Sequence, residues 1–180
     1  MPESGETVRT FVAVLLSEAA AREAERLLDR LRPLARCRWV TRAQLHITLR
    51  FLGELSPAAV ERVRPAVAAV TVQPFDIELH RAGAFPDLAR PRTLWLGGDR
   101  GASELTALAG RVDDALFEVG IPRNNRPFRP HLTLARSDGS PLPPALMREL
   151  ERVPSVAWRC SDISLMRSRL TPRGAVYTRL

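Results

Sequence analysis

Two four-residue segments of this chain nearly repeat each other: His-Ile-Thr-Leu at residues 46–49 and His-Leu-Thr-Leu at residues 131–134. The chain has three histidines, and two of them open this pattern. In both copies apolar and polar residues alternate, which is typical of a β-strand with one buried face. The repeat therefore predicts a fold with two similar halves, each of which contributes a histidine and a threonine to one shared site.

The first copy lies in a longer alternating run, residues 45–51. Regular alternation predicts that Arg50 shares the face of His46 and Thr48, while Phe51 lies on the opposite, apolar face. In the second copy His131 and Thr133 face one way, and the two leucines face the other. The apolar faces can pack under helices while the histidine faces line a groove.

The rest of the chain predicts helices and short strands. Helices are expected at residues 18–32, 57–70, 103–119 and 143–153, with N-caps at Ser17 and Ser56 and a stop at Gly120. Strands are expected at residues 8–16, 37–40, 45–51, 75–80, 93–96, 131–135, 163–167 and 175–179. Strands separated by single helices, without a linker, predict one α+β domain over residues 1–180 with two similar lobes.

The formal net charge is +7, and all 27 basic residues are arginine. An arginine-only composition is typical of a GC-rich genome, but it also has a physical consequence. A guanidinium group binds phosphate through two donors at once, and a basic surface concentrates polyanions. The charge therefore favours an acidic partner such as RNA.

The composition also excludes several classes of protein. With 45% hydrophobic residues, the chain has the composition of a folded globular protein. The longest apolar run near its start, residues 11–16, is too short for a signal peptide or a membrane span. Cys37 and Cys160 provide neither a disulfide framework nor a ligand cluster. We therefore expect a cytoplasmic protein that does not enter a membrane.

Two histidines that face one groove suit the hydrolysis of a phosphodiester. This reaction needs a base that accepts a proton from the nucleophile and an acid that protonates the leaving oxygen, and histidine can do either near neutral pH. The hydroxyls of Thr48 and Thr133 can donate hydrogen bonds to the phosphate oxygens, and Arg136 can add a positive charge. This division of roles requires no metal ion or other cofactor.

Individual residues also have simpler interpretations. Threonine is a common strand former, and Arg136 alone would be an ordinary surface charge. His80, which no threonine follows at the same spacing, is expected to be structural. Two histidines without a third ligand make a weak zinc site, and the chain has no signature of a serine or cysteine nucleophile.

On these residues the chain resembles the 2H phosphoesterase superfamily, and within it the bacterial and archaeal RNA 2′,3′-cyclic phosphodiesterases once called 2′-5′ RNA ligases. Neither motif departs from the family pattern. The likeness covers nearly the whole chain, at residues 9–13, 45–53, 83–86, 94–97 and 126–136, and at Ser168, Leu170, Gly174, Tyr177 and Leu180.

The resemblance implies a bilobal α+β fold with pseudo-twofold symmetry, in which two antiparallel sheets form a central groove and helices cover the outer faces. It implies hydrolysis of a terminal 2′,3′-cyclic phosphate on RNA to a 2′-phosphomonoester. His46 would be the proton donor and His131 the proton acceptor. The phosphate would be bound by Thr48, Thr133 and Arg136.

Three further residues are candidate substrate contacts: Phe51, Phe128 and Arg126. The two phenylalanines could touch a base or a ribose, and burial in the core is an equal alternative for both. Three other functions remain open, namely hydrolysis of small cyclic nucleotides, 2′-5′ ligation of RNA, and RNA binding without catalysis. We expect the protein to be a monomer.

Overall fold

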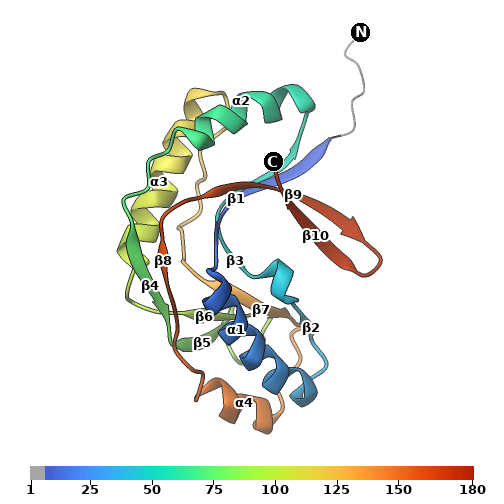
Figure 1. Ribbon diagram of the computed structural model, residues 1–180. Helices are drawn as coiled ribbons and strands as arrows, with labels where there is room; N and C mark the ends of the chain where they lie inside the picture. Colours follow the sequence, from blue (N-terminus) through green and yellow to red (C-terminus); the bar gives the residue numbers. More distant parts are fainter. Residues whose placement is uncertain (1–6) are drawn as a thin grey trace.

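The computed structural model describes residues 7–180, which contain four α-helices and ten β-strands (Figure 1). Residues 1–6 of the expected domain lie outside the described part. The helices are α1 (Glu18–Leu31), α2 (Pro57–Ala68), α3 (Ala102–Glu118) and α4 (Pro144–Leu150), with short 3-10 turns η1 (Arg32–Leu34) and η2 (Arg42–Gln44). The strands are β1 (Val8–Leu15), β2 (Arg38–Trp39), β3 (His46–Leu55), β4 (Phe75–Leu79), β5 (Arg81–Phe85), β6 (Thr93–Gly97), β7 (Leu132–Arg136), β8 (Val156–Cys160), β9 (Ser164–Thr171) and β10 (Gly174–Arg179).

The two expected N-caps and the expected glycine stop are confirmed, whereas the helix expected at residues 143–153 is shorter, at Pro144–Leu150. The hydroxyl oxygens of Ser17 and Ser56 accept hydrogen bonds from the backbone N–H groups of Ala20 and Ala59, each at 3.2 Å. Each bond satisfies one of the N–H groups that the first helical turn leaves without a partner. Gly120 adopts a φ of 87° directly after α3, where a residue with a side chain would be strained.

The strands form two four-stranded sheets and one two-stranded ladder. The order is β10-β9-β1-β3 in the first sheet, here called sheet A, and β2-β7-β6-β5 in the second, sheet B. All paired neighbours are antiparallel. The first histidine motif is on an edge strand of sheet A, and the second is on an inner strand of sheet B. β4 and β8 pair with each other and lead into β5 of sheet B and β9 of sheet A, respectively.

Two strands, β5 and β8, were absent from the sequence-based expectation. The sequence of β5 is Arg-Ala-Gly-Ala-Phe, which contains only one strong strand former. Its Gly83 is required by packing, because a Cβ atom there would lie 2.4 Å from the ring of Trp95 on β6. β8, with the sequence Val-Ala-Trp-Arg-Cys, alternates buried and exposed residues, which is the pattern of a half-buried strand.

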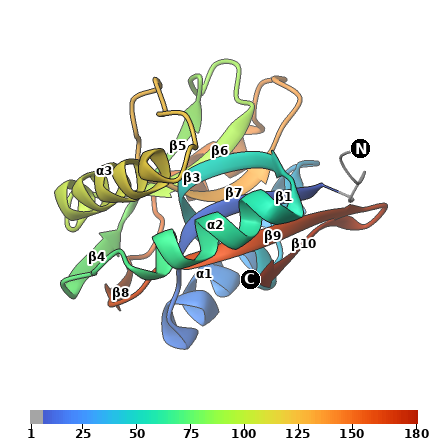
Figure 2. The ribbon, with the colours of Figure 1, turned by 90° about the horizontal axis from the view of Figure 1, so that it is seen from above.

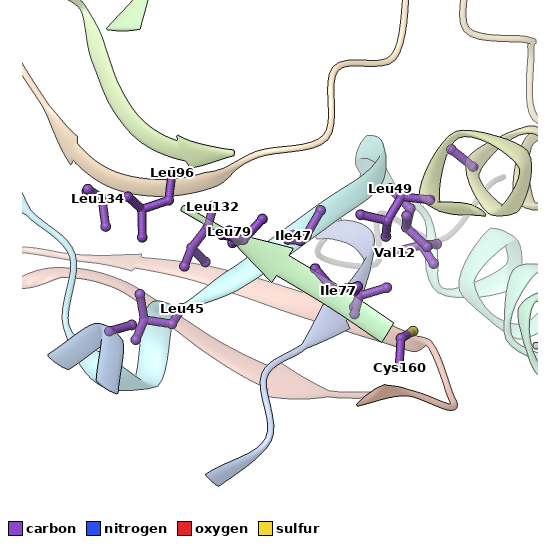
Figure 3. Packing of buried hydrophobic residues seen from close by; sticks show 14 of the residues in the cluster. Val12, Leu45, Ile47, Leu49, Ile77, Leu79, Leu96, Leu132, Leu134 and Cys160 are labelled. Carbon is purple, nitrogen blue, oxygen red and sulfur yellow. The ribbon is translucent and has the colours of Figure 1, made fainter. Parts of the chain in front are cut away.

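Helices cover one face of each sheet. α2 and α3 pack against strands of sheet A and against each other, whereas α1 packs against β8 and α4 against β5. Figure 1 shows α2 and α3 together at one side and α1 and α4 together at the lower end, and Figure 2 shows α1, α2 and α3 from above. The apolar faces of both motif strands, with Ile47, Leu49, Leu132 and Leu134, belong to one buried cluster (Figure 3).

The alternation predicted for the first motif strand is wrong after Leu49. In the pairing of β1 with β3, Ala13 is opposite Thr48 and Val12 is opposite Arg50, so Leu49 is an extra residue, a β-bulge. A bulge reverses the alternation of the residues that follow it. Arg50 therefore shares the core side of Val12, and Phe51 shares the opposite side with Thr48.

The burial of these side chains agrees with the reversed alternation. Arg50 is 11% exposed and its Nε lies 3.3 Å from a carboxylate oxygen of Asp113 on α3. Phe51 is 49% exposed, and the guanidinium of Arg9 lies 4.7 Å from the centre of its ring. The expectation that Arg50 belongs to the histidine face is thus corrected, and the aromatic ring of Phe51 takes its place there.

Candidate active site

Both motif histidines are oriented by the same backbone contact. His46 is the first residue of β3, and its Nδ1 lies 2.7 Å from the carbonyl oxygen of Gln44. His131 directly precedes β7, and its Nδ1 lies 2.7 Å from the carbonyl oxygen of Arg129. Because a carbonyl can only accept, Nδ1 carries the proton in both rings. The other nitrogen, Nε2, is therefore the one that can exchange a proton with a substrate.

The two histidines differ in what contacts Nε2. The Nε2 of His46 lies 2.9 Å from the hydroxyl of Thr48, whereas within residues 7–180 the Nε2 of His131 has no such partner. A neutral His46 accepts a hydrogen bond from this hydroxyl, and a protonated His46 donates one to it. The symmetry of the two sequence motifs is thus broken in the folded protein.

Aromatic rings pack against both imidazoles. The ring of Phe11 lies 4.8 Å from that of His46, and Phe85 lies 4.9 Å from His131 at an interplanar angle of 89°. Tyr177 also contacts His46, at 5.2 Å and 89°. These contacts fix the rings and remove water from one side of each.

Burial lowers the pKa of both histidines below its ordinary value. For His46 burial is the main cause, the hydrogen bond to the Gln44 carbonyl opposes it, and the charge of His131 lowers the pKa further. For His131 burial again comes first, the Arg129 carbonyl opposes it, and the guanidinium of Arg136 lowers the pKa further. The charge of His131 therefore acts on His46, and the two motif strands β3 and β7 contact each other although they belong to different sheets.

Arg136 reaches the histidine face because β7 also contains a bulge. Thr133 is opposite Trp95 and Ala135 is opposite Leu94, so the residue between them, Leu134, is extra. In a regular strand, residues 133 and 136 would lie on opposite faces. The bulge places them on the same face. There the guanidinium of Arg136 donates a hydrogen bond to the hydroxyl of Thr93 at 2.7 Å.

The two motif strands therefore share one design. In each, the leucine after the threonine is the extra residue, so the fifth residue after the histidine lies on the histidine face. That residue is Phe51 in sheet A and Arg136 in sheet B. The site has an aromatic side and a cationic side at corresponding positions.

For Phe128, Arg126 and His80, the structure shows no contact with the two motif histidines in the described residues. Phe128 is partly buried and packs against the main apolar cluster, which favours the core interpretation. Arg126 is exposed in the segment that precedes β7, and its backbone N–H bonds to the side chain of Asn124. His80 is exposed and its backbone N–H bonds to the carbonyl of Gly97, so nothing assigns it to the site.

Besides Phe11 and Phe85, the residues Arg9 and Tyr177 lie at the site and were not among the sequence-based site candidates. Arg9 on β1 covers the ring of Phe51, and Tyr177 on β10 contacts both Phe11 and His46. Their strands read Val-Arg-Thr-Phe-Val-Ala-Val-Leu (β1) and Gly-Ala-Val-Tyr-Thr-Arg (β10), and neither alternates regularly, so the local sequence does not indicate which face is turned to the histidines. Only the order of strands in sheet A does so.

Neither a metal site nor a membrane span is found in the described residues. Residues 7–180 contain no group of three or more histidine, cysteine, aspartate or glutamate side chains that could hold a metal ion. Among the helices of this part of the chain, none has the length and hydropathy needed to cross a membrane.

The fold and the paired His-x-Thr strands are those of a 2H phosphoesterase. The family model described as the 2′-5′ RNA ligase superfamily matches residues 17–172. The chain belongs to this superfamily.

Curated relatives and solved structures agree with this assignment. An RNA 2′,3′-cyclic phosphodiesterase of Aeropyrum pernix is 38% identical over 138 residues, which is 75% of this chain and 78% of the relative. A protein of the same name from Archaeoglobus fulgidus is 33% identical over 94% of this chain and 96% of its own length. Among solved structures, Escherichia coli LigT complexed with 3′-AMP has a TM-score of 0.76 at 27% identity and covers 97% of this chain and 96% of its own. A protein of Thermus thermophilus has a TM-score of 0.78 at 32% identity, with coverage of 96% and 94%.

Proposed function

We propose that this protein hydrolyses the 2′,3′-cyclic phosphate at the end of an RNA chain and leaves a 2′-phosphomonoester. The observation that carries the proposal is the pair of histidines whose Nδ1 atoms are both bonded to backbone carbonyls, so that both present Nε2. An acid and a base of this kind are what the opening of a cyclic phosphodiester needs. The relatives named RNA 2′,3′-cyclic phosphodiesterase support the choice of substrate.

The roles of the two histidines follow from the bond that breaks. His131 Nε2 accepts a proton from water, the water oxygen forms a bond to phosphorus, and the bond between phosphorus and the 3′-oxygen breaks. His46, protonated at Nε2, donates its proton to that 3′-oxygen. The positive charge of Arg136 beside His131 favours the neutral ring, which supports His131 as the acceptor.

Three residues would stabilise the charge that develops on the phosphate. Thr48 and Thr133 offer hydroxyl donors, one from each sheet, and Arg136 offers two parallel N–H donors. Arg136 is also paired in register with the exposed Arg38 of β2. Within residues 7–180 neither arginine lies in a salt bridge with a carboxylate, and two neighbouring cations without an acid favour an anionic ligand.

Phe51 would contact the nucleoside part of the substrate. Its half-exposed ring lies on the histidine face and already carries the guanidinium of Arg9. Flat aromatic rings bind bases of any sequence by stacking. Arg126, exposed near the start of β7, would contact the RNA backbone further from the reacting end.

A direct test uses a short RNA with a 2′,3′-cyclic phosphate, incubated with the purified protein in the presence of EDTA. We expect the wild type to produce the 2′-phosphate, and we expect His46→Ala and His131→Ala each to lose at least about a hundredfold in kcat/KM. His80→Ala is the matched control, because His80 lies outside the site, and it should retain wild-type activity. Adenosine 2′,3′-cyclic phosphate is assayed in parallel.

Other outcomes would redirect the proposal. Loss of activity in EDTA would contradict a metal-independent mechanism. Turnover of the cyclic mononucleotide alone would indicate a phosphodiesterase of small nucleotides, and accumulation of joined RNA would indicate ligation. RNA binding without any product would indicate that the protein is a non-catalytic RNA-binding module.

We also propose that the protein acts as a cytoplasmic monomer. Light scattering after size exclusion should then give a mass near 20.0 kDa, and a mass of twice that value would contradict the proposal.

A further inference from the structure

The hairpin formed by β9 and β10 lies directly beside His46. Tyr177 on β10 packs edge-on against the rings of both His46 and Phe11, at 5.2 Å and 5.0 Å. In the pairing of β10, β9 and β1, Tyr177 is opposite Ser168, which is opposite Arg9. Tyr177 therefore lies on the histidine face of sheet A.

Two arginines of the site act on the pKa of the Tyr177 phenol. Burial raises the pKa of this phenol, whereas the guanidiniums of Arg136 and Arg9 lower it. Arg9 belongs to sheet A and Arg136 to sheet B, so charges from both halves of the site act on this residue. Within residues 7–180 the hydroxyl has no hydrogen-bond partner, although it can donate one and accept others.

Gln44 joins this hairpin to the backbone contact that orients His46. Its side-chain N–H donates to the carbonyl of Ala175 on β10 at 2.7 Å, while its own backbone carbonyl accepts from His46 Nδ1 at 2.7 Å. Its side-chain oxygen accepts from the backbone N–H of Thr41 at 2.9 Å, which completes a capping box around η2. One residue thus fixes both the imidazole and the strand that carries Tyr177.

A small pocket lies beside the hydrogen bond between Gln44 and Ala175. Between η2 and the hairpin lies a space of about 200 Å³, lined by Gln44, Tyr177 and their neighbours. Pairing with β9 holds the backbone of β10, and in the described residues the Gln44–Ala175 bond is the hydrogen bond that joins β10 to η2.

We propose that Tyr177 is a further substrate-contacting residue, whose hydroxyl donates a hydrogen bond to a phosphate oxygen, and that Gln44 is the positioning residue that holds Tyr177 in place. The proposal rests on the function proposed above. The ring of Tyr177 packs against His46, so a phosphate bound at His46 Nε2 lies close to this tyrosine. The hydroxyl would supply sheet A with a third donor, beside Thr48 and the imidazole.

The test of Tyr177 removes only its hydroxyl. Tyr177→Phe keeps the ring that packs against His46, and Thr178→Ala changes the next residue of β10, which lies on the other face. We expect Tyr177→Phe to weaken the binding of adenosine 2′-monophosphate, measured by calorimetry, by roughly tenfold to a hundredfold, because a hydrogen bond to a charged group is lost. Thr178→Ala should bind like the wild type. Equal affinity of Tyr177→Phe and the wild type would overturn the proposal, as would a wild type that does not bind this nucleotide.

The positioning role of Gln44 is tested by a double-mutant cycle. Gln44→Met loses the bond to Ala175, and Thr41→Val is its control, because it weakens the same capping box but keeps that bond. We expect Gln44→Met to weaken nucleotide binding while Thr41→Val does not. In the Tyr177→Phe background Gln44→Met should add less than about twofold, since Gln44 acts through the phenol. Additive losses would show that Gln44 does not act through Tyr177.

These measurements separate the inference from the proposed function. Binding of adenosine 2′-monophosphate requires no turnover, so a wild type that binds it but does not hydrolyse the cyclic phosphate leaves the role of Tyr177 intact. In that case only the proposed hydrolysis fails. Hydrolysis that is unaffected by Tyr177→Phe, with unchanged binding, leaves the function intact and removes the role of Tyr177.

Discussion

At the scale of single residues, the contact from each Nδ1 to a carbonyl two residues earlier determines which nitrogen can react. The carbonyls of Gln44 and Arg129 belong to backbone that is fixed by the fold, so neither ring can change its tautomer without losing a bond. The same geometry in both halves gives two equivalent Nε2 atoms. Their surroundings make the two atoms different, because the hydroxyl of Thr48 contacts His46 and the charge of Arg136 acts on His131.

The lowered pKa values of the histidines predict an acid-shifted activity profile. The proposed donor must be protonated, and a lowered pKa means that it loses its proton at a lower pH, so the alkaline limb moves down. The proposed acceptor must be neutral, and its lowered pKa moves the acid limb down as well. We expect the bell-shaped profile of kcat/KM to have its maximum below about pH 6.5, the ordinary pKa of histidine.

The role of Arg136 in this profile can be measured separately. Its positive charge lowers the pKa of His131. Arg136→Gln should therefore move the acid limb to higher pH, besides reducing the rate. A maximum above about pH 7 in the wild type, or an acid limb that does not move in the variant, would contradict this account.

At the scale of elements, the bulges in β3 and β7 decide what each strand presents to the site. Without the extra leucine, Arg50 would lie beside Thr48 and Arg136 would point into the core. With the extra residue, Arg50 points to α3 and forms an ion pair with Asp113. The carboxylate of Asp113 also accepts from the backbone N–H of Asn124 at 3.2 Å, so it ties β3, α3 and the segment after α3 together.

We expect Asp113→Ala to lower the free energy of unfolding by about 3 kcal/mol, because it leaves the largely buried Arg50 without its carboxylate. Asp114 is the matched control. Its side chain is 66% exposed and pairs with Arg123, so Asp114→Ala should cost less than about 1 kcal/mol. Urea denaturation of the three proteins measures both values. Equal stability of the two variants would show that the Arg50–Asp113 pair contributes no more than a surface pair.

At the scale of the whole molecule, the two lobes, one built on sheet A and one on sheet B, share one core. The main apolar cluster contains Val12 and Ile47 from sheet A together with Leu96 and Leu132 from sheet B. The β4–β8 ladder connects the lobes a second time, since each of its strands leads into a different sheet. Neither lobe can therefore bury its apolar surface alone, and we propose that residues 1–180 form a single domain.

A single domain predicts one cooperative unfolding transition. Trp39 and Trp95 lie in sheet B and Trp158 lies in the β4–β8 ladder, so tryptophan fluorescence reports on those two parts, whereas far-ultraviolet circular dichroism reports on all helices and strands. We expect both signals to change at the same urea concentration, as in two-state unfolding. Two separate transitions would show that the lobes unfold independently.

The sequence by itself determined much of this protein. The repeated His-x-Thr pattern indicated two similar halves and a two-histidine site. The caps Ser17 and Ser56 and the stop Gly120 located ends of three helices. These signals depend on neighbouring residues only. The sequence did not predict strand β5. Its Gly83 is needed because the ring of Trp95 packs closely on it, and this contact is with a different strand.

Only the tertiary structure decided which side chains reach the site. Alternation predicts a face only while strand pairing stays in register, and whether Leu49 and Leu134 become extra residues depends on the strands beside them. The placement of Phe51, Arg136 and Tyr177 followed from those pairings and from the order of strands in the sheets. The local sequence specified the chemical groups, and long-range pairing specified how they meet.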